Sequence, residues 1–141
     1  MKKELELKLV EKYPMIFKDY GGDLRKTCMA WGMSCGDGWY NLINNLCKDL
    51  MIIIKGTNTK ITAEQVKEKF GGLRFYFSVQ EDDVQEDDDT DLFGKISNRI
   101  NVAEEMSYKI CETCGEDGEV RGGGWLKTLC NFCEEERKNN V

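Results

Sequence analysis

Two pairs of closely spaced cysteines near the C-terminal end constrain this chain more than any other feature. Cys111 and Cys114 form one C-x-x-C pair, and Cys130 and Cys133 form a second pair after fifteen intervening residues. Two residues between cysteines allow a tight turn to direct both sulfurs at one ion, and two such turns complete a tetrahedron of thiolates. The spacing therefore predicts a zinc ribbon with Zn²⁺ as its cofactor. Because four protein ligands leave no open coordination position, the predicted zinc is structural and not catalytic.

The composition narrows the functional classes. The chain has 141 residues, enough for one compact domain that carries a small zinc module. The absence of histidine excludes Ser-His and Cys-His nucleophile pairs and imidazole acid–base catalysis. No phosphate-binding glycine loop of common spacing occurs, so nothing in the sequence supports an enzyme. Seven cysteines without a secretion signal indicate a reducing cytoplasm, and we expect Cys28 and Cys35 to be buried small hydrophobic side chains.

Charge is distributed unevenly along the chain. Residues 1–79 carry a net charge of +4, residues 80–91 carry eight acidic groups and no basic one, and residues 92–141 carry a net charge of −2. The acidic segment lacks core residues and predicts a flexible surface loop. An acidic chain is a poor candidate for binding duplex DNA, because phosphate contacts need a local basic surface.

Apolar periodicity predicts an α+β fold, in which a helix-rich domain carries a small antiparallel sheet and the C-terminal zinc ribbon. Predicted helices cover residues 3–13, 39–54 and 91–110, with a short one at 134–138. A capping-box pattern at 62–65 predicts a further helix that ends near Phe70, before two glycines. Residues 73–79 alternate apolar and polar side chains and predict a strand. We expect an α+β core over 1–79, the acidic loop over 80–91, and a helix plus zinc ribbon over 92–141, packed on the core.

Two groups of side chains outside the zinc ribbon are candidate binding residues. Trp31, Asp37 and Trp39 lie in a segment dense in glycine and aromatic residues. They could form a pocket in which rings contact a ligand and the carboxylate orients it, or they could be a helix cap beside two core tryptophans. Arg74 and Tyr76 share the polar face of the 73–79 strand, where they would suit a phosphate or a nucleotide. A solvent-exposed polar face is the alternative for that pair.

Three segments together resemble a family of small uncharacterised proteins encoded by bacteriophages and prophages. They are CMAWGMSCGDGWY at 28–40, VKEKFGGLRFY at 66–76 and the C-terminal C-x-x-C pairs. The resemblance covers about residues 1–79 and 92–135, whereas the acidic segment between them departs from it. It implies a phage origin and a location in the cytoplasm of a bacterial host. No activity comes with it, but small phage proteins of this kind often inhibit host or defence proteins.

Three functions from different classes are consistent with these observations. The first is a non-enzymatic interaction protein that inhibits a host or anti-phage defence protein by direct binding. The second is a small-molecule binder, such as a sponge for a nucleotide signal, with Trp31, Trp39, Arg74 and Tyr76 around its ligand. The third is a zinc protein that binds nucleic acid, which the few basic residues between the cysteine pairs make the least favoured of the three.

Overall fold

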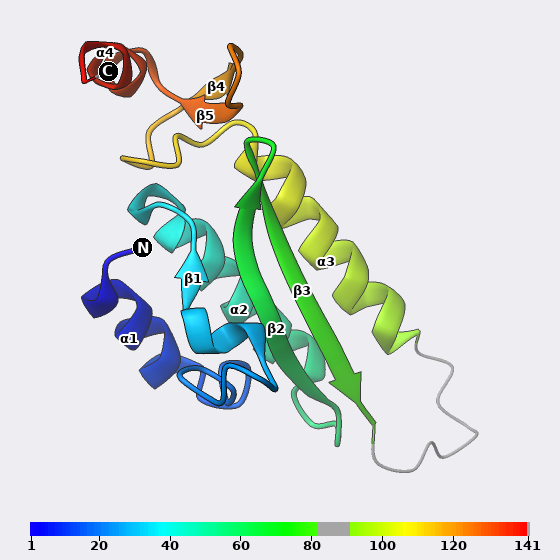
Figure 1. Ribbon diagram of the computed structural model, residues 1–141. Coiled ribbons are helices and arrows are strands. Elements are labelled where there is room, and N and C mark those ends of the chain that lie inside the picture. Colours follow the sequence, from blue (N-terminus) through cyan, green and yellow to red (C-terminus); the bar gives the residue numbers. More distant parts are fainter. Residues whose placement is uncertain (82–90, 141) are drawn as a thin grey trace.

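The computed structural model describes residues 1–81 and 91–140, and these have the predicted α+β architecture (Figure 1). The helices are α1 (Lys3–Lys12), α2 (Tyr40–Ile54), α3 (Leu92–Ser107) and α4 (Asn131–Asn139), with two short 3-10 helices, η1 (Cys28–Trp31) and η2 (Asp37–Trp39). The strands are β1 (Met33–Ser34), β2 (Lys60–Lys69), β3 (Gly72–Gln80), β4 (Glu119–Arg121) and β5 (Lys127–Leu129). The helices predicted at 3–13, 39–54 and 91–110 are confirmed, and α4 contains the predicted 134–138 segment.

Two sheets organise the described residues. In the larger sheet the strand order is β1-β2-β3, with β1 parallel to β2 and β2 antiparallel to β3. The smaller sheet is the antiparallel hairpin of β4 and β5, which lies beyond one end of β2 and β3 (Figure 1). None of the helices in residues 1–81 and 91–140 has the length and apolar character that crossing a membrane requires. Of the acidic loop predicted over 80–91, Gln80 instead ends β3 and Asp91 caps α3, where its carboxylate accepts from the backbone N–H of Gly94. Residues 82–90, on which the predicted flexibility depends, lie outside the described residues.

The prediction of a helix from 62 to 70 is wrong, because this segment is most of β2. Ile61, Ala63 and Val66 are fully buried, and a bulge between Ala63 and Gln65 keeps Val66 on the buried side. A helix cap stabilises by about 1 kcal/mol, whereas fully burying one Val or Ile side chain contributes about 1.5–3 kcal/mol. Tertiary burial and pairing with β3 therefore override the local capping signal. The glycines predicted to stop a helix instead belong to the β2–β3 turn and the start of β3.

The hydrophobic core joins α1, α2 and α3 to the larger sheet. The apolar stripe predicted for α2 is buried, and its Leu46 and Leu50 have no exposed surface. α3 runs along β3 (Figure 1) and supplies partners for that strand's outer edge. Ser107 Oγ accepts from the backbone N–H of Leu73 at 2.8 Å, and a carboxylate oxygen of Glu104 accepts from that of Phe75 at 2.9 Å. Strand-edge donors that would otherwise be unpaired are thus satisfied by helix side chains.

Candidate metal centre

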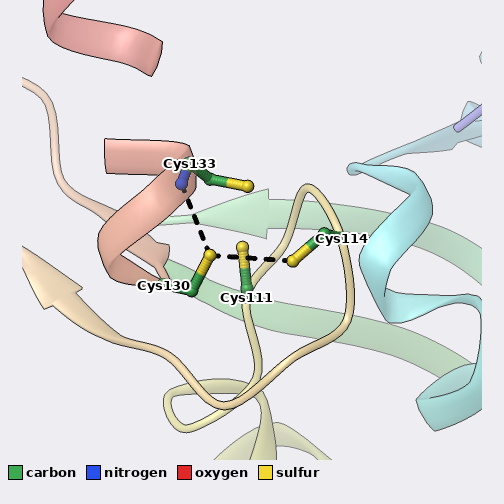
Figure 2. Close-up of side chains that lie close together, drawn as sticks. All are labelled: Cys111, Cys114, Cys130 and Cys133. Atoms are coloured by element: carbon green, nitrogen blue, oxygen red, sulfur yellow. Dashed lines mark hydrogen bonds between the residues drawn. The ribbon is translucent and has the colours of Figure 1, made fainter. Parts of the chain in front are cut away.

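The four cysteines of the two C-x-x-C pairs converge in the structure (Figure 2). Their sulfur atoms all lie within 4.8 Å of one another, and the Sγ atoms of Cys114 and Cys130 are 3.7 Å apart. Cys111 and Cys133 are buried, Cys130 is half-buried and Cys114 is exposed. The residues that sequence spacing predicted as metal ligands therefore form a group that could hold a metal ion.

Local backbone structure places each pair of sulfurs. After α3, the backbone N–H of Cys111 donates to the Glu116 carbonyl at 2.7 Å, and that of Gly115 donates to the Cys111 carbonyl at 2.9 Å. Gly115 has a φ of +86°, a conformation that favours glycine and lets the turn close. The second pair lies at the start of α4, where Cys130 Sγ accepts from the backbone N–H of Cys133 at 3.4 Å. Both turns point their sulfurs at the same volume.

The thiol groups differ in how readily they lose a proton. Burial raises the pKa of Cys111, but backbone N–H groups of Cys130, Cys114 and Thr113 outweigh it and lower the pKa to about 7. Burial and the neighbouring thiols raise the pKa of Cys133. Four thiolates this close repel one another, so full deprotonation requires a cation among them. Metal binding by this group would therefore release protons.

One side of the cysteine module, defined as residues 108–140, rests on the segment 35–39. The backbone N–H of Gly36 donates to a carboxylate oxygen of Glu112 at 2.9 Å, and that of Gly38 donates to the Glu112 carbonyl at 2.7 Å. The indole N–H of Trp39 donates to the Ile110 carbonyl at 2.9 Å. A Cβ on Gly38 would overlap the carbonyl oxygen of Cys111. The glycines at 36 and 38 thus allow backbone to approach the first cysteine turn.

The turn between β2 and β3 supports another part of the module. Thr128 of β5 donates from its hydroxyl to the Gly71 carbonyl at 2.6 Å. A Cβ on Gly72 would overlap the ring of Tyr108, whose hydroxyl accepts from Arg74 at 3.2 Å. Residues of the two segments 28–40 and 66–76 therefore provide surfaces on which the cysteine module rests. Sequence reasoning found the four cysteines that could hold a metal ion but missed this support.

The structure places the candidate binding residues in different environments. Trp39 is fully buried, in agreement with the alternative prediction that the tryptophans are core residues. Trp31 does not agree with it, because its side chain is 72% exposed. The Asp37 carboxylate accepts from the backbone N–H of Lys2 at 2.7 Å, so its predicted role as a helix cap is wrong. Arg74 is half-buried, while its neighbour on the same face, Tyr76, is exposed.

The two cysteines outside the cluster that were expected in the core differ from each other. Cys35 is buried, and burial raises the pKa of its thiol to about 12. Cys28 is exposed at the start of η1, so its predicted burial is wrong. Residue type alone predicts the same burial for both cysteines. The difference in their exposure comes from the tertiary packing.

An open groove beside the module was not predicted. It encloses about 260 Å³ and is lined by Glu68 of β2, by Phe70 of the β2–β3 turn and by Gly124, Trp125 and Leu126 of the β4–β5 loop. Phe70 and Trp125 are each 67% exposed. The sequence held a signal for Phe70, because a bulky residue before Gly-Gly is unusual in a hairpin turn. The signal was not recognised because a helix was predicted to end at this residue.

Comparison of the chain with protein-family models, with curated proteins and with solved structures gave no match.

Proposed function

We propose that the four-cysteine site holds one zinc ion with a structural role. Zinc–sulfur bonds of about 2.3 Å place the sulfurs of a tetrahedron about 3.8 Å apart, and the separation of 3.7 Å between the Cys114 and Cys130 sulfurs fits this geometry. Soft thiolate ligands in a tetrahedral set favour zinc over calcium or magnesium. Four cysteines complete the coordination shell, so the ion would stabilise the module and would bind no substrate.

Metal analysis tests this assignment directly. Protein purified under reducing, chelator-free conditions should contain one equivalent of zinc, and Cys130→Ala should contain far less. Zinc content should fall because three thiolates bind zinc more weakly than four do. Without zinc, no positive charge would neutralise the remaining buried thiolates. Wild-type protein that carries no zinc, and takes up none on titration, would contradict the proposal.

The chain itself is proposed to be a non-enzymatic interaction protein, in which the zinc holds a binding surface in shape. The observation that carries this proposal is the set of exposed aromatic side chains around the module. Trp125 and Phe132 of the module and Phe70 of the adjoining turn are each about two-thirds exposed. Exposed aromatic groups on a rigid support are typical anchors of protein–protein interfaces.

The resemblance to small phage proteins extends the proposal to a partner class. The chain would act in the cytoplasm of a bacterial host, where it would inhibit a host or anti-phage defence protein by covering part of its surface. The support for this step is the class of protein to which the segments at 28–40 and 66–76 are similar. No reaction is needed, because occlusion by a rigid surface suffices.

Affinity capture from bacterial lysate tests the interaction. The zinc-loaded protein, tagged at its C-terminal end, should retain a partner in stoichiometric amount. The double variant Trp125→Ser/Phe132→Ser should lose that partner, whereas Trp31→Ser, an equally exposed tryptophan outside the module, should keep it. If no stoichiometric partner appears from several hosts and growth conditions, the interaction proposal fails while the zinc assignment stands.

No observation raises the other two functions to a second candidate. A nucleotide site formed by Trp31, Trp39 and Arg74 would need Trp39 to reach solvent, yet its ring is buried and its N–H is engaged by Ile110. A nucleic-acid site on the module would need free basic groups. Several of the module's basic groups instead lie within 4.0 Å of carboxylates, in the pairs Arg121–Glu119, Lys127–Glu112, Arg137–Glu134 and Lys138–Glu134.

A further inference from the structure

We infer that the groove lined by Glu68, Phe70, Gly124, Trp125 and Leu126 binds a partner segment that presents one large apolar side chain next to a lysine or arginine. This rests on the proposed function as an interaction protein and names the chemistry of its partner. The groove joins two parts of the chain, because its first two residues belong to the β2–β3 hairpin and the others to the β4–β5 loop.

Both walls of the groove are held by hydrogen bonds. Arg137 of α4 donates to the carbonyl oxygen of Trp125 at 2.6 Å, which ties the loop to the helix that carries the second cysteine pair. Thr128 donates to the Gly71 carbonyl at 2.6 Å, which ties β5 to the opposite wall. The groove is therefore formed before any partner arrives, which lowers the entropic cost of binding. Its volume of about 260 Å³ suits one or two side chains and is small for a drug-sized ligand.

The backbone of Phe70 provides an independent observation. Phe70 and Gly71 form the two-residue connection between β2 and β3, and their φ angles are +53° and +86°. Positive φ at both positions is the feature of a type I′ turn, for which Asn-Gly is strongly preferred. A phenylalanine at the first position is strained and also exposes its ring to water. Folding alone favours asparagine here, so the aromatic ring is best explained by binding.

The charge of the groove identifies the second part of the partner's chemistry. Glu68 is the one charged residue among those that line it, and its Oε1 accepts from the backbone N–H of Gly71 at 2.8 Å, which fixes the carboxylate in place. Lys69 lies on the Phe70 ring, with its amino group 5.7 Å from the ring centroid. A cationic side chain on the Glu68 side of the apolar anchor would complement this carboxylate.

The test is selection of binding peptides from a displayed random library with the zinc-loaded protein. We expect enriched peptides to share an aromatic or large aliphatic residue followed or preceded closely by lysine or arginine. The best peptide, measured by fluorescence anisotropy, should bind at least about tenfold more weakly to Trp125→Ser and to Phe70→Asn, as expected for anchor residues. Trp31→Ser is the matched control and should bind as the wild type does.

Glu68→Gln separates charge from shape, because glutamine keeps the Oε1 acceptor for Gly71 and removes only the negative charge. The variant should bind the selected peptide several-fold more weakly than the wild type does. It should also bind that peptide no better than a peptide in which norleucine replaces the lysine. The Phe70→Asn variant should bind the peptide more weakly, while its melting temperature stays equal to that of the wild type or rises. If the ring had a purely structural role, the substitution would lower the melting temperature.

Three outcomes would overturn the inference. They are enrichment of acidic peptides, binding that survives both Phe70→Asn and Trp125→Ser, and no enrichment from the library. Self-association would also overturn it: if sedimentation shows a dimer that Trp125→Ser dissociates, the occupant is a second copy of the chain. Peptide selection does not depend on capture from lysate. Failure to find a cellular partner and failure of the groove to bind peptides would therefore be seen in different experiments.

Discussion

The substitution Gly38→Ala would test whether the cysteine module rests on the 35–39 segment as described. A Cβ at Gly38 would overlap the Cys111 carbonyl oxygen and lie 2.6 Å from the Gly115 nitrogen. Both contacts are with backbone, so no side-chain rotation relieves them. The φ of Gly38 is not in the left-handed region, so the effect is steric and involves no dihedral strain. The first cysteine turn would have to move away from the core.

The expected cost follows from the contacts that this movement breaks. The hydrogen bond from Gly38 to the Glu112 carbonyl contributes about 0.5–1.5 kcal/mol, and the one from Gly36 to the Glu112 carboxylate about 1.5–3 kcal/mol, since it involves a charged group. Some of each is recovered by water in the displaced state. We therefore expect Gly38→Ala to lower the free energy of unfolding by about 2–4 kcal/mol, a large part of the 5–15 kcal/mol typical of a domain.

Urea denaturation of the zinc-loaded protein measures this change. Gly122→Ala is the matched control, because nothing lies within 4 Å of its Cβ position and its φ is ordinary, so its stability should change by less than about 0.5 kcal/mol. Zinc content should be measured for both variants, to separate loss of docking from loss of metal. If Gly38→Ala unfolds within 0.5 kcal/mol of the wild type, the described contact between the segment and the first cysteine turn is refuted.

Three further predictions concern thiols, the edge of β3 and alkaline pH. In the zinc-loaded protein a thiol reagent should modify Cys28 alone within minutes, and chelation should make the four cysteines of the module reactive as well. The two cysteines buried in the core, Cys35 and Cys47, should stay protected throughout; mass spectrometry of alkylated peptides reports this. Ser107→Ala should cost about 1–3 kcal/mol in urea denaturation, because the buried N–H of Leu73 loses its acceptor. Burial and the hydrogen bond to Glu6 raise the pKa of Tyr20 from 10.0 to about 12. The stability that this provides is fully present below pH 10 and is lost as the pH rises toward 12, so Tyr20→Phe should flatten the decline in unfolding free energy over that range.

Each of these three predictions has an outcome that would contradict it. Ser78→Ala, on the exposed face of β3, should leave stability unchanged, and an equal loss there would remove the edge explanation for Ser107. Rapid labelling of all seven cysteines before chelation would contradict protection of the cluster by a bound metal ion. A Tyr20→Phe variant with the wild-type slope between pH 10 and 12 would show that this hydroxyl does not control the alkaline transition.

Elements with a strong local signal were predicted correctly from the sequence. The stripe of apolar residues in α2 and the alternation in β3 each repeat over several turns or residues. The apolar run at 51–54 could also have started a strand, but it is the last turn of α2. β2 was missed because its signals conflict. A hydroxyl and a glutamine three residues apart fit a capping box, and the bulge after Ala63 interrupts the alternation that would have indicated a strand.

The candidate binding residues show the same division between local and tertiary information. Sequence reasoning selected Trp31, Trp39 and Arg74 because aromatic and guanidinium groups are typical of binding sites, but residue type does not determine exposure. Only packing places Trp39 under the first cysteine turn and leaves Trp31 in solvent. The exposed aromatic residues at the groove, Phe70 and Trp125, belong to turns whose neighbours across space cannot be read from the chain.

The sequence by itself determined which four cysteines form the candidate metal site, because the geometry of a C-x-x-C turn is local and two such turns can define a tetrahedral site. It also determined the α+β class through the periodicity of its apolar residues. Only the tertiary structure decided what the glycines at 36, 38 and 72 are for. Their role is to let one backbone or ring approach another at a distance that any side chain would prevent, and that depends on which distant segment arrives there.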